Sequence, residues 1–178
     1  NISVREINPL SVSIAMDGRM TYADTNVVTE AAPWYWYASS ANYIFPRLNT
    51  GGGTGKLSWL QNASSVLDYV ETGGSYYSPD ILVPFDIASR HGSTFINGAT
   101  EGVALTADTT PTALPDLSAT DLNLAYDYMG TISVFRVWDR DLGDDGIVEA
   151  TNPSLEPSLS LTFEGTGTNS FVVNNWSN

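Results

Sequence analysis

Four aspartates follow an apolar segment that ends at Trp138: Asp139, Asp141, Asp144 and Asp145. Hard cations such as Ca²⁺ prefer several carboxylate oxygens, so Asp139, Asp141 and Asp144 are candidate calcium ligands. The segment lacks the loop spacing of an EF-hand and its closing glutamate. We favour a structural alternative, in which Asp139 ends a strand and Asp144 or Asp145 caps a short helix by accepting a backbone N–H. We therefore expect no cofactor, with calcium as the weaker hypothesis.

Aromatic side chains gather in the run Trp34-Tyr35-Trp36-Tyr37 and in the pair Tyr76-Tyr77. Such rings stack on the C–H face of a pyranose while their polar atoms stay in water, so these residues could hold a sugar. Alternate side chains of a strand point to opposite faces, so two of the first four would pack inside. A contact between subunits is an alternative use for the run. The glycan-binding residues that we predict are Trp34, Trp36, Tyr76 and Tyr77.

The chain has a single histidine, His91, and a Ser-His-Asp triad would have to use it with Ser89 or Ser93. No Gly-x-Ser-x-Gly nucleophile elbow accompanies this histidine. We therefore predict that His91 lies in a turn with Gly92 and bonds to the backbone.

Paired carboxylates would indicate a glycoside hydrolase, because a retaining enzyme holds two of them about 5 Å apart. Asp68, Glu71 and Asp86 lie on or beside predicted strands, but the sequence contains no Glu-x-Asp-x-x-Glu signature. We predict no catalytic residue and no enzymatic activity. A polysaccharide-degrading glycosidase or lyase is the alternative from a different functional class.

The charge balance restricts the partners. The 178 residues include 20 acidic and 7 basic side chains, for a formal net charge of −13. A nucleic-acid-binding domain needs a basic surface, and an anionic membrane repels such a chain, so we expect neither partner. No stretch of about 20 apolar residues could enter a bilayer. The chain has no cysteine, so its stability comes from core packing and not from disulfides.

Period-two alternation of apolar residues predicts an all-β protein. Segment 10–16, in which every second residue is apolar, is the clearest strand. Asp17-Gly18 would turn the chain after it, and Asn97-Gly98 is the strongest hairpin signal in the sequence. Further strands are predicted over 42–48, 56–61, 66–70, 81–90, 93–96, 103–107, 122–126 and 132–138, with weaker ones at 159–163 and 171–173.

Two of these strands have predictable positions in a sheet. Pro46 cannot donate to a hydrogen-bond ladder, so strand 42–48 should lie at an edge or carry a bulge. Strand 132–138 is apolar on both faces, which favours a central position. The one helix that we predict covers residues 144–150.

The predicted fold class is an all-β, two-sheet antiparallel jelly-roll sandwich with one short helical turn. We expect a single domain over 1–178, with 1–9 and 165–178 as extended arms. The start of the chain lacks an initiator Met and the pattern of a signal peptide, so we expect a processed chain or a piece of a longer one.

The last two-fifths of the chain resemble a known family. The order is the Asn97-Gly98 hairpin, a strand over 122–126, the strand 130–138 (GTISVFRVW) and a helical turn over 142–150. This order is similar to the C-terminal half of laminin-G-like, concanavalin A-like jelly-roll domains. Sequences with this tail also resemble domains of tailed-phage virions and phage-like particles, where they decorate a tail fibre, tail tip or head fibre. The resemblance implies surface attachment and assigns no individual site residue.

From these observations we predict a non-enzymatic virion structural or attachment domain that binds host-surface glycan or anchors a fibre or tail component. Its partners would be other virion proteins and host-surface polysaccharide, in a homo-oligomer located in the virion and thus extracellular. One alternative is a purely architectural virion subunit or decoration protein. The other is the polysaccharide-degrading enzyme considered above.

Overall fold

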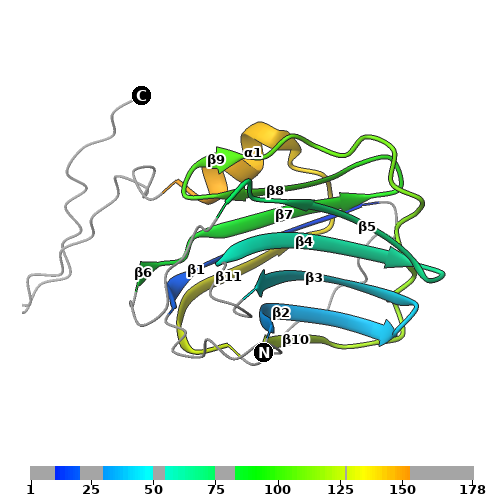
Figure 1. The fold of residues 1–178 in the computed structure, drawn as a ribbon, viewed down its shortest axis with the longest axis horizontal. Coiled ribbons are helices and arrows are strands. Elements are labelled where there is room, and N and C mark those ends of the chain that lie inside the picture. The colour runs from blue at the N-terminus through cyan, green and yellow to red at the C-terminus, as the bar shows by residue number, and fades with distance from the viewer. Residues whose placement is uncertain (1–10, 21–29, 50–54, 75–82, 127, 153–178) are drawn as a thin grey trace, which may run out of the picture.

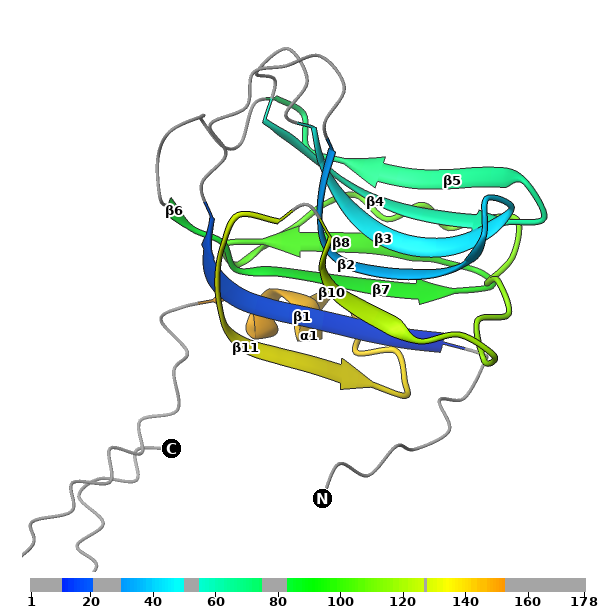
Figure 2. The same ribbon diagram turned by 90° about the horizontal axis from the view of Figure 1, so that it is seen from below.

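The computed structural model describes residues 11–20, 30–49, 55–74, 83–126 and 128–152. These residues form two facing antiparallel sheets and one short helix (Figures 1 and 2), so the predicted all-β, two-sheet sandwich is confirmed. No helix in this part of the chain is long and apolar enough to cross a membrane. Several predicted features lie outside the described residues, namely the strands at 159–163 and 171–173 and the arms at 1–9 and 165–178.

Sheet A contains six strands in the order β11-β1-β7-β8-β9, with β6 also paired to β1. Their bounds are β1 Ser11–Met20, β6 Val83–Pro84, β7 Ile87–Gly92, β8 Ile96–Thr100, β9 Val103–Ala104 and β11 Gly130–Trp138. Sheet B contains five strands in the order β10-β2-β3-β4-β5. Their bounds are β2 Glu30–Ser39, β3 Asn42–Asn49, β4 Lys56–Ala63, β5 Val66–Glu71 and β10 Leu122–Tyr126.

The main core fills the space between the two sheets, because alternate residues of each strand point inward. Trp34 from sheet B meets Phe135 from sheet A edge to face, with ring centroids 6.0 Å apart. Trp59 of β4 lies over Gly98 of β8, where even a methyl group would overlap the indole. The largest fully buried core residues are Trp34, Trp59, Phe85, Ile14, Met16, Met20, Ile44, Leu48, Leu57, Ile87 and Ile96.

The helix α1, Gly143–Ala150, packs against the outer face of sheet A through Ile147. Alanines at positions 15, 88 and 99 leave room for the helix to approach the strands closely. The predicted helix over 144–150 is therefore confirmed, with its start one residue earlier. Its predicted cap by Asp144 or Asp145 is wrong, because the N-cap residue is Leu142, which makes no side-chain cap hydrogen bond. Instead, Asp141 Oδ1 accepts a hydrogen bond of 2.8 Å from the backbone N–H of Gly143.

The predicted Asn97-Gly98 turn lies inside β8, so this prediction is wrong. The chain turns at Glu101-Gly102, where both residues have positive φ, 50° and 76°. Such a pair fits the tight turn between antiparallel strands. The glycine at position 98 is needed for the close approach of Trp59. The other expected turn, at His91-Gly92, is the end of β7.

Strand β1 continues past Asp17-Gly18, where a turn was expected, and ends at Met20. The register of β1 against β11 shifts between Asp17 and Gly18, which marks a bulge. A side chain at Gly18 would overlap the carbonyl of Thr131 on β11. This glycine therefore permits a close backbone approach within the sheet and does not end the strand.

Strand β11 was predicted to be central, but among the described strands it pairs with β1 alone and forms an edge of sheet A. Its two apolar faces have a different cause. Phe135 packs against the core between the sheets, whereas Trp138 packs against the cluster beneath α1. A helix over an edge strand thus produces the same two-sided apolar pattern as a central strand of a sheet covered on both faces.

Strand β3 is not an edge strand, because β2 and β4 flank it. The expected irregularity is present, but the bulge lies on the partner strand: between the pairs Ala31–Leu48 and Trp36–Ile44, β2 contains four residues and β3, with Pro46, only three. Pro33 of β2 lies within the same interval. The ladder is therefore irregular where both strands lack a backbone donor.

Candidate functional site

The aromatic run on β2 is divided between the two faces of sheet B. Trp34 and Trp36 point into the core with exposed fractions of 0% and 8%, and Trp36 Nε1 donates to the carbonyl oxygens of Leu117 and Thr120 at 3.2 and 3.1 Å. Their assignment to a surface platform is corrected, because the strand turns these two rings inward. Tyr35 and Tyr37, two residues apart, point to the outer face instead.

Four rings form a cluster on this outer face, which we call the aromatic cluster: Tyr35, Tyr37, Tyr43 and Phe45. Tyr37 stacks on Tyr35 with centroids 5.0 Å apart and on Tyr43 with centroids 5.9 Å apart, and the planes are within 16° of parallel. Phe45 packs 4.9 and 5.1 Å from the Tyr35 and Tyr43 centroids. Because the tyrosine rings cover part of one another, the cluster offers ring edges and phenol groups more than one flat platform.

The outward side chains of β4 are nearly buried between those of β3 and β5. Ser58, Leu60 and Asn62 are exposed by only 1%, 2% and 6%. On β5, by contrast, Leu67 and Tyr69 are 42% and 50% exposed. The pairing of β4 with both neighbours places three rows across the sheet: Tyr43–Asn62–Leu67, Phe45–Leu60–Tyr69 and Arg47–Ser58–Glu71.

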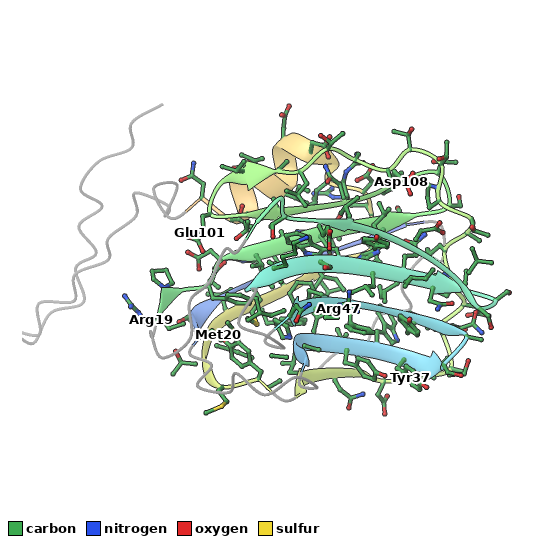
Figure 3. The ribbon with its side chains drawn as sticks, in the orientation of Figure 1. Arg19, Met20, Tyr37, Arg47, Glu101 and Asp108 are labelled. Atoms are coloured by element: carbon green, nitrogen blue, oxygen red, sulfur yellow. The ribbon has the colours of Figure 1, made fainter. Side chains whose placement is uncertain are left out.

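The third row makes one end of the face polar. Glu71 accepts from Lys56 Nζ at 3.2 Å and from Ser58 Oγ at 3.4 Å, and Arg47 lies on the other side of Ser58. Figure 3 views sheet B from this side and shows Arg47 over the middle of the sheet and Tyr37 nearer the β2–β3 turn. The face can therefore offer apolar contact at one end and charged hydrogen-bonding groups at the other.

Several residues of this face have no counterpart among the predicted site residues. Tyr43, Phe45 and Tyr69 alternate with apolar residues on predicted strands. A short turn at Ser40-Ala41 joins β2 to β3 and brings the rings of both strands to one side. Predicting that turn from the sequence could have placed Tyr43 and Phe45 beside the tyrosines of β2. The predicted residues Tyr76 and Tyr77 lie outside the described part of the chain.

His91 lies in a strand and is fully buried, so its predicted turn position is wrong. Its Nδ1 is 3.1 Å from Gln61 Oε1, so it bonds to a side chain and not to the backbone. Burial lowers the pKa of His91 to about 3. Ser89, one of the two candidate nucleophiles, has no hydrogen bond at its buried Oγ, so it does not form a Ser–His pair.

The carboxylates considered for hydrolysis do not converge on β5. Asp68 stands opposite Gln61 and Glu71 opposite Ser58, which places them on opposite faces of the strand. Asp68 Oδ2 accepts a hydrogen bond of 2.7 Å from the backbone of Thr112. Glu71 belongs to the polar row described above.

Arg90 holds the acidic segment that was considered for calcium. Its Nε is 2.8 Å from Asp144 Oδ1 and its Nη1 is 3.0 Å from Asp141 Oδ2, while the guanidinium lies over the Phe95 ring. Asn97 Nδ2 donates to the same Asp144 oxygen at 2.6 Å. Within the described residues, no three acidic, histidine or cysteine side chains are placed to hold a metal ion. The segment thus ties α1 to β7 and β8, as an Arg–carboxylate fork can.

We expect Arg90→Met to lower the free energy of unfolding by about 2 kcal/mol, because it removes a largely buried guanidinium that bonds to Asp141 and Asp144 and lies over Phe95. Chemical denaturation measures this loss. The matched control is Arg136→Met, since the Arg136 side chain is 45% exposed against 12% for Arg90 and its pair with Asp17 should contribute at most about 0.5 kcal/mol. Equal effects of the two substitutions would contradict a special role for Arg90.

No protein-family model matches the chain, and no curated protein matches it. Several solved structures, however, match the chain in fold. A carbohydrate-binding module, CBM40, of a Ruminococcus gnavus IT-sialidase aligns at TM-score 0.58 and 11% identity, over 80% of this chain and 83% of that one. The likeness shows the fold. A leech intramolecular trans-sialidase aligns at TM-score 0.62 and 12% identity, and a botulinum neurotoxin serotype D binding domain at 0.62 and 10%. The alignments cover 81% and 83% of this chain but only 23% and 38% of those chains.

Proposed function

We propose that this chain is a non-enzymatic glycan-binding domain and that the outer face of sheet B contacts the sugar. The observation that carries the proposal is the aromatic cluster on a solvent-facing sheet surface, beside a row of charged and hydroxyl side chains. Sugars present apolar C–H faces and many hydroxyls, and this face offers both kinds of contact. The fold gives further support, since one structurally similar CBM40 was solved with α2,3 sialyllactose bound.

The biological setting that we propose is attachment of a phage or phage-like particle to a cell. The domain would be a structural part of the virion, exposed outside the cell and repeated in a homo-oligomer. The remaining part of the laminin-G-like order, β10 followed by β11 and α1, resembles domains of phage particles and supports this setting. Single glycan sites bind weakly, and many linked copies raise the overall affinity by orders of magnitude. The ligand would be host-surface polysaccharide, with other virion proteins as structural partners.

Tyr37→Ala tests the site, because Tyr37 stacks on both Tyr35 and Tyr43. We expect the variant to bind the best glycan of an oligosaccharide array at least about tenfold more weakly, since the ordered ring surface is lost. The array should include α2,3-sialyllactose and lactose, so that charged and neutral sugars are compared. Titration calorimetry then measures the affinity of each protein.

The matched control is Val103→Ala, which removes an apolar side chain that is 56% exposed on sheet A. It should bind like the wild type. Unchanged binding by Tyr37→Ala would move the glycan site away from the aromatic cluster. If the wild type binds no glycan on the array and captures nothing in a pull-down with host envelope, the proposal of glycan binding is overturned altogether.

An architectural role without a ligand is the second candidate. Large apolar side chains are exposed on or beside edge strands of both sheets, and a packed assembly would cover them. Analytical ultracentrifugation distinguishes the two functions, because a stable oligomer that binds no glycan favours the architectural role. The exposed residues are Val66, Leu67, Tyr69, Val103, Leu124, Met129 and Val137.

A further inference from the structure

Asn62 is an amide among apolar neighbours on the outer face of sheet B. It is 6% exposed, and Tyr43 and Leu67 stand directly opposite it on the two adjacent strands. Its Oδ1 is buried and has no hydrogen bond. Leu60, two residues earlier on the same face, adds a further apolar neighbour. A buried carbonyl without a partner costs about 1–3 kcal/mol, so this position does not favour stability.

Other buried amides of the described chain are paired. Asn97 donates to Leu105 O at 3.0 Å and accepts from the backbone of Gly98 at 2.9 Å. Gln61 donates to two backbone carbonyls at 2.9 and 2.8 Å, while its Oε1 meets His91. Asn62 differs because it lies on the face that we propose to bind ligand. An unpaired polar group at such a place indicates a partner that comes from outside.

We propose that Asn62 is a specificity-determining residue of this face, a step that rests on the glycan-binding function proposed above. Its side-chain amide would bond to a hydroxyl or N-acetyl group of the sugar, while the apolar side of the sugar lies against Tyr43 and Leu67. Rotation about the Cβ–Cγ bond lets the amide present either its oxygen or its NH₂ group. The exposed Leu67 and Tyr69 beside it are free of close packing on one side, so they can shift to admit the sugar.

This arrangement predicts selectivity as well as affinity. A site that supplies a hydrogen-bonding group in apolar surroundings rejects a ligand that lacks the matching group, because the polar atom then stays unpaired. A sugar that lacks the one contacted hydroxyl or amide should therefore bind much more weakly than its parent. The face without this amide should treat the two sugars alike.

Asn62→Leu is the direct test, since leucine has a similar volume and no polar atoms. We expect it to bind the best array glycan at least about tenfold more weakly than the wild type and to lose discrimination against deoxy derivatives of that glycan. Its melting temperature should equal or exceed that of the wild type, because the unpaired carbonyl is removed. Asn97→Leu is the matched control for stability and should melt several degrees lower, since it breaks hydrogen bonds that are made.

The outcomes separate this inference from the proposed function. A wild-type protein that binds glycan, together with an Asn62→Leu variant that binds and discriminates equally well, overturns the inference alone. A large drop in melting temperature for Asn62→Leu also overturns it, because the amide would then have a structural partner. If the wild type binds no glycan, the proposed function fails, and the role of Asn62 fails with it.

Discussion

Gly98→Ala is expected to reduce the free energy of unfolding by about 3 kcal/mol, although it adds a single methyl group. The new Cβ would overlap three atoms of the Trp59 indole, namely Cδ2, Cε2 and Cε3. Trp59 is fully buried, so its ring cannot swing into solvent. Either the ring or strand β8 must move, and both belong to the contact between the two sheets.

Urea denaturation followed by tryptophan fluorescence measures this loss. Gly73→Ala is the matched control, because no atom lies within 4 Å of the added methyl group. A second test uses Trp59→Leu, which opens space above position 98. The double variant with Gly98→Ala should lose less stability than the sum of the single variants, since the two sites share one contact. Additive losses, or a stable Gly98→Ala protein, would contradict the packing argument.

The fold class could be predicted because it depends on local patterns. Alternation along the segment of β1 predicts a strand, although its second face is buried as well, with Ala15 beneath α1. The short acidic segment before Ile147 predicts a helix. The number of strands and the glycine- and proline-rich connections then leave a two-sheet sandwich as the simplest way to bury those faces. These signals need no knowledge of which strand pairs with which.

The turns were harder to predict, because glycine occurs both in tight turns and where another residue packs closely against the backbone. Asn97-Gly98 has the composition of a tight turn, yet Gly98 is required by a tryptophan 39 positions away in the sequence. Glu101-Gly102 forms the turn, although glutamate is an unusual residue at positive φ. A local reading of the chain contains no information on the approach of Trp59, which depends on how the sheets face each other.

The candidate site was predictable only in part, for a related reason. Alternation requires that two residues of the β2 run point inward, but the choice between the tryptophans and the tyrosines depends on which face meets sheet A. Asn62 has no signal in the sequence at all. Its significance comes from burial without a hydrogen bond, which is a property of the folded chain.

Acidification is expected to destabilise the protein through the buried histidine, His91. Burial lowers the pKa of this imidazole from 6.5 to about 3 in the folded protein. The unfolded chain therefore takes up a proton as the pH falls through 6.5, whereas the folded protein takes it up only near pH 3. The contribution to stability is present above pH 6.5 and is lost as the pH falls, by at most about 1.4 kcal/mol per pH unit. From pH 7 to pH 4 the loss amounts to about 3 kcal/mol.

The surroundings of His91 leave the burial penalty uncompensated, because they offer no acceptor for a second ring N–H. Gln61 uses its NH₂ group on two backbone carbonyls, so its Oε1 must accept from Nδ1–H of the histidine. The other ring nitrogen, Nε2, is buried without a hydrogen bond. A proton added there would place an unpaired charge in the core. None of the hydrogen bonds described brings a carboxylate to this ring to neutralise the charge.

His91→Asn isolates this effect, because asparagine can keep the donor to Gln61 and cannot titrate. The comparison is needed because the chain has a net charge of −13, and protonation of its carboxylates relieves repulsion in the same pH range. At pH 7 the variant should be about 1–2 kcal/mol less stable, owing to the smaller side chain. The difference should shrink as the pH falls and reverse near pH 5, as measured by urea denaturation at each pH. A constant difference, or an imidazole NMR signal from this single histidine that titrates near pH 6.5 in the folded protein, would show that the ring is not held neutral by burial.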